Sequence, residues 1–236
     1  MHSRFKVIAA FALGTALVAG CANAQSKTKK SKSKPAAAKV MKQMDSDVAA
    51  VGGTGVPVGY FGRADRPTQK LSDAKYVKVG NGWDVTTGPA HILWNPKQTA
   101  TGNYTVTAIF DQLETPKHPE SYGIFIGGSD LEGAGQSYLY FLVRGSGEAF
   151  AQTRKGDVLT GRIAWQKSAA VPMADASGKG TYTLSMRVAG DSVHFLVNGN
   201  GVAVLPKKDI PTDGIYGIRI NHNLHVHATP VAITRP

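Results

Sequence analysis

Residues 121–155 read SYGIFIGGSDLEGAGQSYLYFLVRGSGEAFAQTRK, and this stretch decides the fold. Its pattern predicts three β-strands, joined first by a Gly-rich connection and then by a tight turn at Gly145-Ser146-Gly147. In the middle strand, residues 138–144, side chains of two kinds alternate with a period of two. One face is purely apolar and is expected in a core; it consists of Leu139, Phe141 and Val143.

The other face of the middle strand has a different character. It carries Tyr138, Tyr140, Leu142 and Arg144. Flat aromatic rings beside a cation are typical of a sheet surface that faces a ligand. The alternative is an ordinary solvated sheet face whose tyrosines are half covered by a loop.

The same alternation recurs on both sides of this stretch. Further strands are predicted at 103–111, 181–188, 192–197 and 215–221. Asn198-Gly199-Asn200-Gly201 predicts a tight hairpin turn, because Asn and Gly tolerate positive φ. Residues 57–236 contain no long segment with the 3.6-residue period of a helix, so we expect one all-β domain, an antiparallel two-sheet β-sandwich. Its predicted core consists of Val106, Phe110, Ile124, Ile126, Leu139, Phe141, Val143, Leu184, Met186, Phe195, Val197, Ile218 and Ile220.

Two other segments are harder to interpret. Trp83–Val85 and His91–Trp94 flank Thr87-Gly88-Pro89, and this arrangement predicts a short pair of strands. Asp157–Lys179 contains Trp165 and is interpreted as a long, partly ordered connection.

The last third of the chain resembles a known superfamily. Residues 181–206, TYTLSMRVAGDSVHFLVNGNGVAVLP, followed by DGIYGIRI at 213–220, are similar to strands of the laminin-G and concanavalin A-like lectin/glucanase superfamily. Residues 121–144 look like mid-sandwich strands of its glycoside-hydrolase-16-like and 3-keto-disaccharide-hydrolase-like domains. The resemblance covers the strand pattern of about residues 80–236. It implies a jelly-roll sandwich with a concave face of the kind that often binds glycans.

A catalytic motif of this superfamily is missing from the sequence. Its retaining glucanases carry Glu-x-Asp-x-x-Glu on a concave strand, and this chain does not. A retaining glycosidase needs two carboxyls about 5–5.5 Å apart. The close acid pairs are Asp45 with Asp47, in a predicted tether, and Asp130 with Glu132, in a Gly-rich loop that we interpret as a solvated turn. Catalysis therefore stays uncertain, and the sequence favours a protein that is not an enzyme.

The sequence gives little support for a metal site or for a serine-hydrolase motif. On a strand, His225 and His227 share a face and could ligate a metal, but zinc needs a third ligand that is not evident. The Asp130–Glu132 loop could hold calcium, yet its spacing matches no EF-hand. No G-x-S-x-G elbow is present either. We predict an exposed polar strand face, a plain loop, and no metal or cofactor.

The predicted ligand site combines two strands. Arg219 and Asn221 share the face of strand 215–221 that lies opposite Ile218 and Ile220. Sugars present apolar C–H faces and hydroxyl groups, so their sites place aromatic rings beside fixed hydrogen-bond donors and acceptors. The predicted glycan-binding residues are Tyr138, Tyr140, Arg144, Arg219 and Asn221.

The formal net charge of +11 is concentrated near the N-terminus. Residues 1–42 carry nine Lys or Arg and no acid, which leaves 18 basic against 16 acidic residues in the remainder. A nucleic-acid-binding domain would carry its basic excess on its folded surface. We therefore expect no nucleic-acid partner.

The first 24 residues are interpreted as an export signal. Arg4 and Lys6 precede the apolar run Val7–Gly20, which is short for a membrane span. Ala22-Asn23-Ala24 predicts ordinary signal-peptide cleavage before Gln25, whereas Leu17–Cys21 resembles the bacterial lipobox, in which the cysteine is lipidated. Cys21 is the single cysteine of the chain and falls at the lipobox position, which favours a lipoprotein.

Residues 25–56 are predicted to form a disordered, Lys-rich tether. Its lysines could contact anionic lipid headgroups, or the tether could be a solvated spacer. The expected location is the cell envelope, with the domain anchored to a membrane and facing the periplasm or the exterior; the alternative is a soluble periplasmic or secreted protein. Three function classes follow: a non-catalytic glycan-binding module, a glycan-processing enzyme, and a structural envelope lipoprotein.

Overall fold

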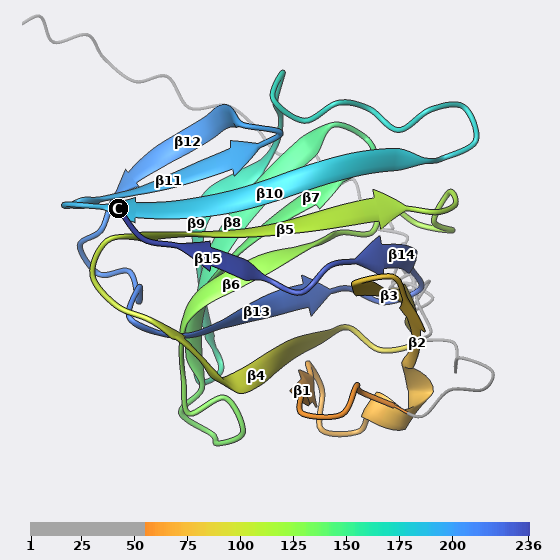
Figure 1. The fold of residues 1–236 in the computed structure, drawn as a ribbon, viewed down its shortest axis with the longest axis horizontal. Coiled ribbons are helices and arrows are strands. Elements are labelled where there is room, and N and C mark those ends of the chain that lie inside the picture. The colour runs from red at the N-terminus through yellow and green to blue at the C-terminus, as the bar shows by residue number, and fades with distance from the viewer. Residues whose placement is uncertain (1–54) are drawn as a thin grey trace, which may run out of the picture. The chain divides into compact units, whose positions relative to one another are not determined.

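The computed structural model describes residues 55–236, so the predicted leader, Cys21 and most of the predicted tether lie outside the described residues. Two antiparallel sheets pack face to face (Figure 1). Within residues 55–236 the one helical element is the short 3-10 turn η1, Leu71–Asp73. Among these residues, no helix has the length and apolar character needed to cross a membrane. The predicted all-β, two-sheet sandwich is confirmed.

The first sheet has seven strands. In spatial order they are β1 (Phe61–Ala64), β4 (His91–Ala100), β13 (Gly214–Ile220), β6 (Tyr122–Ser129), β7 (Ser137–Arg144), β8 (Glu148–Lys155) and β9 (Val158–Lys167). Strand β6 therefore separates β7, which carries three of the predicted ligand-binding residues, from β13, which carries Arg219 and is followed by Asn221.

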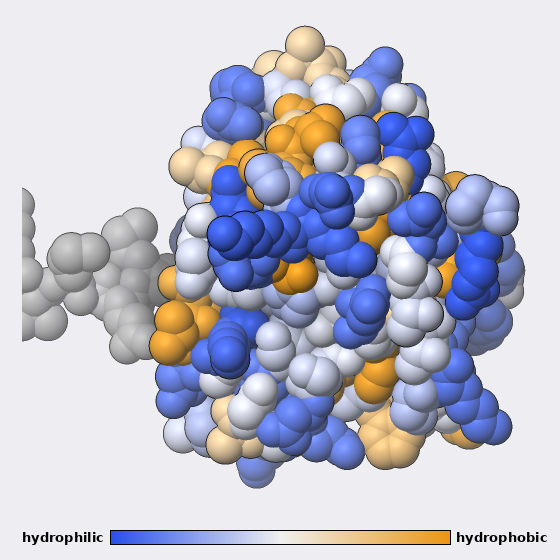
Figure 2. All heavy atoms as spheres, turned by 90° about the vertical axis from the view of Figure 1, so that its left-hand side faces the viewer, coloured by the Kyte–Doolittle hydropathy of each residue, from blue (hydrophilic) through white to orange (hydrophobic). Residues whose placement is uncertain are grey.

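The second sheet has eight strands. In order they are β12 (Asn200–Pro206), β11 (Ser192–Val197), β10 (Gly180–Ala189), β5 (Tyr104–Gln112), β14 (His225–Ala228), β3 (Gly82–Thr86) and β2 (Lys75–Val79), while β15 (Ala232–Thr234) also pairs with β5. At the end of the sandwich where β10 turns into β11, hydrophilic residues predominate, with small hydrophobic patches between them (Figure 2).

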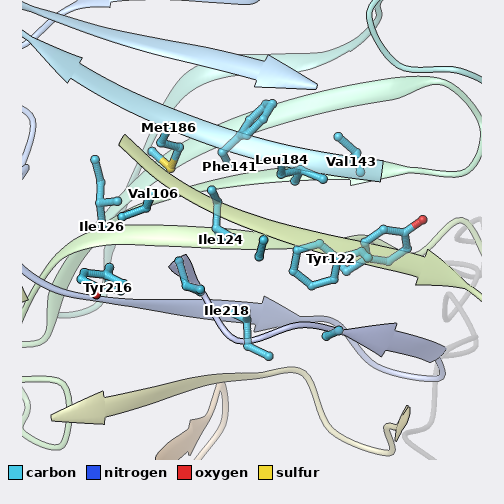
Figure 3. Close-up of a cluster of buried hydrophobic side chains, with 14 of the residues drawn as sticks. Val106, Tyr122, Ile124, Ile126, Phe141, Val143, Leu184, Met186, Tyr216 and Ile218 are labelled. Atoms are coloured by element: carbon cyan, nitrogen blue, oxygen red, sulfur yellow. The ribbon is translucent and has the colours of Figure 1, made fainter. Parts of the chain in front are cut away.

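The core lies between the two sheets and contains all thirteen residues predicted for it. Figure 3 shows part of this core. Each is at most 3% exposed. Alternation dictates this burial, because every second side chain of a strand points to the same face. Phe141 of β7 meets Phe195 of β11 across the core, with ring centroids 5.3 Å apart.

The predicted hairpin turn between β11 and β12 is also confirmed. Asn198 and Gly199 have φ values of 51° and 79°, and the two strands pair on either side of them. Positive φ at both positions matches the right-handed twist of the strands, and Asn-Gly is the dipeptide that accepts it most readily.

The predicted pairing of Trp83–Val85 with His91–Trp94 is wrong. Both segments are strands, but β3 pairs with β2 and β14, whereas β4 pairs with β1 and β13 in the other sheet. The chain changes sheets between them. Thr87 fixes this crossing, because its N–H donates to Leu224 O and its carbonyl accepts from Asn223 N–H.

The interpretation of Asp157–Lys179 as a connection is wrong for its first half, which forms β9. This strand lies at a sheet edge, and most of its side chains are exposed on both faces. Two register shifts also interrupt its pairing with β8. An edge strand with bulges does not bury every second side chain. Its sequence therefore lacks the alternation of apolar and polar residues that predicts the other strands.

Candidate functional site

A second apolar cluster covers the outer face of the seven-stranded sheet, away from the core. Five rings form a continuous row across it, which we call the aromatic row: Phe125, Tyr138, Tyr140, Phe150 and Trp165. Successive ring centroids along the row are 5.4, 5.7, 6.1 and 4.7 Å apart. Strands β6, β7, β8 and β9 each contribute to the row, because their outward residues align across adjacent strands.

The two predicted tyrosines lie in the covered part of this row. Tyr138 is 1% exposed and Tyr140 is 5% exposed. The Tyr140 hydroxyl donates a hydrogen bond to Gln152 Oε1 of the neighbouring strand. In this structure the tyrosines form the floor of the face, and a ligand would meet other side chains before it met their rings.

Arg219 lies above Tyr140, with its guanidinium carbon 4.8 Å from the ring centroid. Its Nη1 and Nη2 donate to the two carboxylate oxygens of Asp65, at 2.7 and 2.6 Å. Burial alone would raise the pKa of Asp65. The charge and hydrogen bonds of Arg219, with the charge of Arg154, lower it by more than burial raises it, so the net shift of the pKa is downward. This pair clamps the segment after β1 onto the sheet face and covers the tyrosines.

Arg144 marks the other, more open end of the face. Its guanidinium carbon lies 3.6 Å from the ring centroid of Trp165, a distance that indicates direct cation–π stacking. Trp165 in turn stacks on Phe150 with an interplanar angle of 16°. Glu148 is the nearest acid to Arg144, at 4.0 Å. Phe150, Trp165 and Arg144 are all partly exposed.

Asn221 follows β13 at this same end of the sheet. Ile220 pairs with Tyr122 and Tyr122 pairs with Val143, so Asn221 and Arg144 belong to the row of residues just beyond. The Asn221 Nδ2 donates to Ser121 Oγ at 2.9 Å.

The structure thus brings all five predicted residues onto one sheet face. Arg219 and the tyrosines lie in its covered part, and Arg144 and Asn221 at its open end; ligand binding by them stays a prediction.

A cleft of about 420 Å³ opens beside Arg144, and we call it the Arg144 cleft. Its walls come from residues 112–120, 144–146 and 174–178. Two acids line it. Glu120 lies 2.9 Å from His222, and Asp175 accepts hydrogen bonds from the backbone N–H groups of Ser177 and Lys179 within its own turn.

The two histidines and the Asp130 loop that were considered as metal sites make contacts within the protein. His227 Nδ1 lies 2.7 Å from Asp84 Oδ1, and His225 lies 3.9 Å from Glu114. Across residues 55–236 no three His, Cys, Asp or Glu side chains come together as metal ligands would. Asp130 Oδ2 accepts from the Gly135 N–H at 2.8 Å and so closes its own loop.

Sequence reasoning missed several residues of this face. Asp65 is 154 positions from Arg219 and follows a four-residue strand, so no local pattern points to the pair. Trp165 lies in a segment whose sequence lacks alternation and so predicts a connection instead of a strand. Phe150 and Gln152 could have been found, because EAFAQTRK at 148–155 alternates and places both on one face.

No family model and no curated protein matches this sequence. Among solved structures, a carbohydrate-binding module, CBM66 from Bacillus subtilis, is similar with a TM-score of 0.54 and 10% identity, over 78% of this chain and all of that one. A glycoside hydrolase family 16 endo-glucanase from Bacteroides ovatus has a TM-score of 0.52 and 8% identity, over 74% of this chain and 94% of the other.

The Ca²⁺- and mannose-bound luminal domain of VIP36 has a TM-score of 0.52 and 9% identity, over 75% of this chain and 83% of that one. The chain has the concanavalin A-like fold. Identities of this size show the fold alone, which confirms the superfamily resemblance at that level. The concanavalin A-like fold is shared here by proteins that bind glycans and by a protein that processes them.

Proposed function

We propose that this chain is an exported glycan-binding module of the cell envelope and that it binds its ligand without catalysis. The observation that carries the proposal is the stack of Phe150, Trp165 and Arg144 beside the Arg144 cleft. The partly exposed stack offers apolar contact for sugar C–H groups, and its guanidinium offers hydrogen-bond donors for hydroxyls. The glycan-binding proteins that share the fold support the same ligand class.

Export and anchoring form the second part of the proposal. The apolar leader directs the chain out of the cytoplasm, and lipidation of Cys21 attaches it to a membrane. The Lys-rich segment 25–56 then separates the domain from the lipid surface and adds attraction to anionic headgroups. The sandwich is thereby presented to envelope polysaccharide.

A second candidate function is glycan processing, because Glu120 and Asp175 line the same cleft. The surroundings of Asp175 argue against a role as general acid. Hydrogen bonds from Ser177 and from the backbone of its own turn lower the pKa of Asp175, which favours the ionised form. A general acid needs the opposite shift, and a solvated turn holds its carboxylate for structure.

A glycan array, run with a hydrolysis screen of the same sugars, tests the proposal. Retention without turnover is expected. Turnover would favour the enzyme, and no response in either assay would favour a structural envelope protein.

Site variants locate the binding. Replacing Trp165 by Ala should weaken retention about tenfold or more, as expected when a stacking partner is lost. Leu159→Ala changes another exposed side chain of the same strand and serves as the matched control. An equal loss of glycan retention in Trp165→Ala and Leu159→Ala would contradict a binding site at the Arg144 end of the face.

A further inference from the structure

A second cleft, of about 450 Å³, lies at the opposite edge of the aromatic face, and we call it the β1 cleft. Residues 62–71 form most of its wall, and Glu132 reaches it from the loop between β6 and β7. Asp65, the partner of Arg219, lines it as well. The function proposed above makes no use of this cleft.

Two further arginines stand next to the Asp65–Arg219 pair. Arg63 Nη1 donates to the carbonyl oxygens of Leu131 and Gly133, and Arg154 Nε donates to the Gly156 carbonyl at 3.0 Å. With the Gln136 amide turned so that its oxygen faces them, that oxygen accepts from Arg63 at 3.2 Å and from Arg154 at 3.1 Å.

These contacts leave positive charge without a counter-charge. Carbonyl and amide oxygens satisfy the N–H groups of Arg63 and Arg154 but carry no formal charge. The one carboxylate among them, Asp65, is taken up by the fork of Arg219, and its Oδ1 is 4.0 Å from Arg154 Nη1. Arg66 is a third, exposed cation, and Glu132 is the single opposing acid left. Of the arginines, Arg63 and Arg66 line the cleft, whereas Arg154 and Arg219 adjoin it through Asp65. Together these four arginines, against Asp65 and Glu132, give the cluster an excess of two positive charges.

We propose that the β1 cleft binds the carboxylate of an acidic sugar, so that the glycan recognised by this domain contains uronic acid. The inference rests on the glycan-binding function proposed above and names its ligand class. Guanidinium groups match carboxylates in planar, two-point geometry, and Asp65 already shows that geometry in this cluster. Arg63, Arg66 and Arg154 supply the charge, and the aromatic row continues the binding face toward the Arg144 cleft.

Calorimetry on the full chain with trigalacturonate and with its methyl ester tests the assignment, because the ester keeps the sugar rings but replaces each carboxylate charge by a neutral methyl ester. The acid should bind about tenfold or more tightly than the ester, and the difference should shrink as salt is raised. Arg66→Gln and Arg154→Gln should each weaken binding of the acid about tenfold and leave the ester unchanged. Arg66 is exposed, so its replacement should preserve the fold even if Arg154→Gln does not.

Arg187→Gln is the matched control, since Arg187 lies on β10 of the other sheet. Equal binding of acid and ester would overturn the acidic ligand and leave glycan binding intact. Undiminished binding of the acid by both variants would place its carboxylates elsewhere, for example on the lysines of residues 26–42, and would also overturn the proposal. Displacement of the sugar by inorganic sulfate at equal concentration would exclude sugar recognition, and failure of both probes and of the array would remove both proposals.

Discussion

At the scale of single residues, His91 is a buried imidazole with both nitrogens engaged. It is 1% exposed, its Nδ1 lies 2.9 Å from Pro89 O, and its Nε2 lies 2.5 Å from the Tyr76 hydroxyl. A carbonyl oxygen can only accept, so Nδ1 carries the proton and Nε2 accepts from Tyr76. Burial lowers the pKa of His91 to about 4.

This depressed pKa predicts acid sensitivity. Between about pH 6.5 and pH 4 the unfolded chain binds a proton at His91 that the folded chain does not. The contribution of neutral His91 to the free energy of unfolding is therefore fully present above the pKa of the unfolded chain. It is lost as the pH falls toward the pKa of the folded chain, and the loss amounts to up to about 3 kcal/mol. Unfolding free energies of wild type and His91→Gln at pH 7 and pH 4.5 should differ mainly at pH 7. His194→Gln, at a partly exposed position on β11 of the other sheet, should follow the wild type; parallel curves for His91→Gln and the wild type would contradict the prediction.

Phe141 provides a residue-scale test of packing. It is fully buried between the sheets, so truncation to Ala should cost about 3–5 kcal/mol of unfolding free energy. Val204→Ala removes an exposed side chain and should stay within about 0.5 kcal/mol. Chemical denaturation measures both, and a loss below about 1 kcal/mol for Phe141→Ala would show that the core tolerates the cavity.

At the scale of elements, β1 depends on the Asp65–Arg219 pair as well as on its short ladder with β4. Asp65→Ala leaves the guanidinium buried without its carboxylate, and we expect a loss of about 3 kcal/mol. The double variant Asp65→Ala with Arg219→Met should recover a large part of this loss, because the charge is gone and the apolar stem remains. Thermal denaturation of the wild type, the single variant and the double variant measures the loss and the recovery. Equal stability of the single and double variants would mean that the pair does not hold β1.

Strands that bury one face could be read from sequence, and strands at the margins could not. Leu184 and Met186 of β10 alternate with polar residues because one face of that strand meets the core. Strand β9 has one neighbour, and no side of it is fully buried, so burial imposed no alternation there. The pairing of strands could not be predicted from the sequence either. Strands β3 and β4 are neighbours in sequence, yet they pair with strands of different sheets.

Part of the candidate site could be predicted from the sequence and part could not. Alternation placed Tyr138, Tyr140 and Arg144 on the outward face of one strand, and the structure shows them there. The cover over the tyrosines depends on Asp65, which is distant in sequence, so their burial could not be foreseen. Trp165 could not be placed on this face because the sequence pattern did not predict its strand, β9.

At the scale of the whole molecule, the proposed lipid anchor makes a direct prediction. Mass spectrometry of the mature protein should find a lipid-modified N-terminus at Cys21. Cys21→Ala should release the protein from membranes without changing the thermal unfolding of the domain, because the domain forms its core without that residue. An unmodified chain that starts at Gln25 would exclude the anchor and leave export intact.

Two strands that come late in the sequence, β13 and β14, also govern when the molecule can fold. Strand β13 lies between β4 and β6, and β14 lies between β3 and β5 (Figure 1). Strands β1 to β4 therefore gain their lateral partners in the rest of the sandwich only when residues 214–228 arrive. Such long-range pairing makes folding slow, since the chain must close large loops before the contacts form. Until then β1 can pair only with β4 and β2 only with β3, so the sandwich stays incomplete, and the export proposed above would meet a polypeptide that has not yet folded.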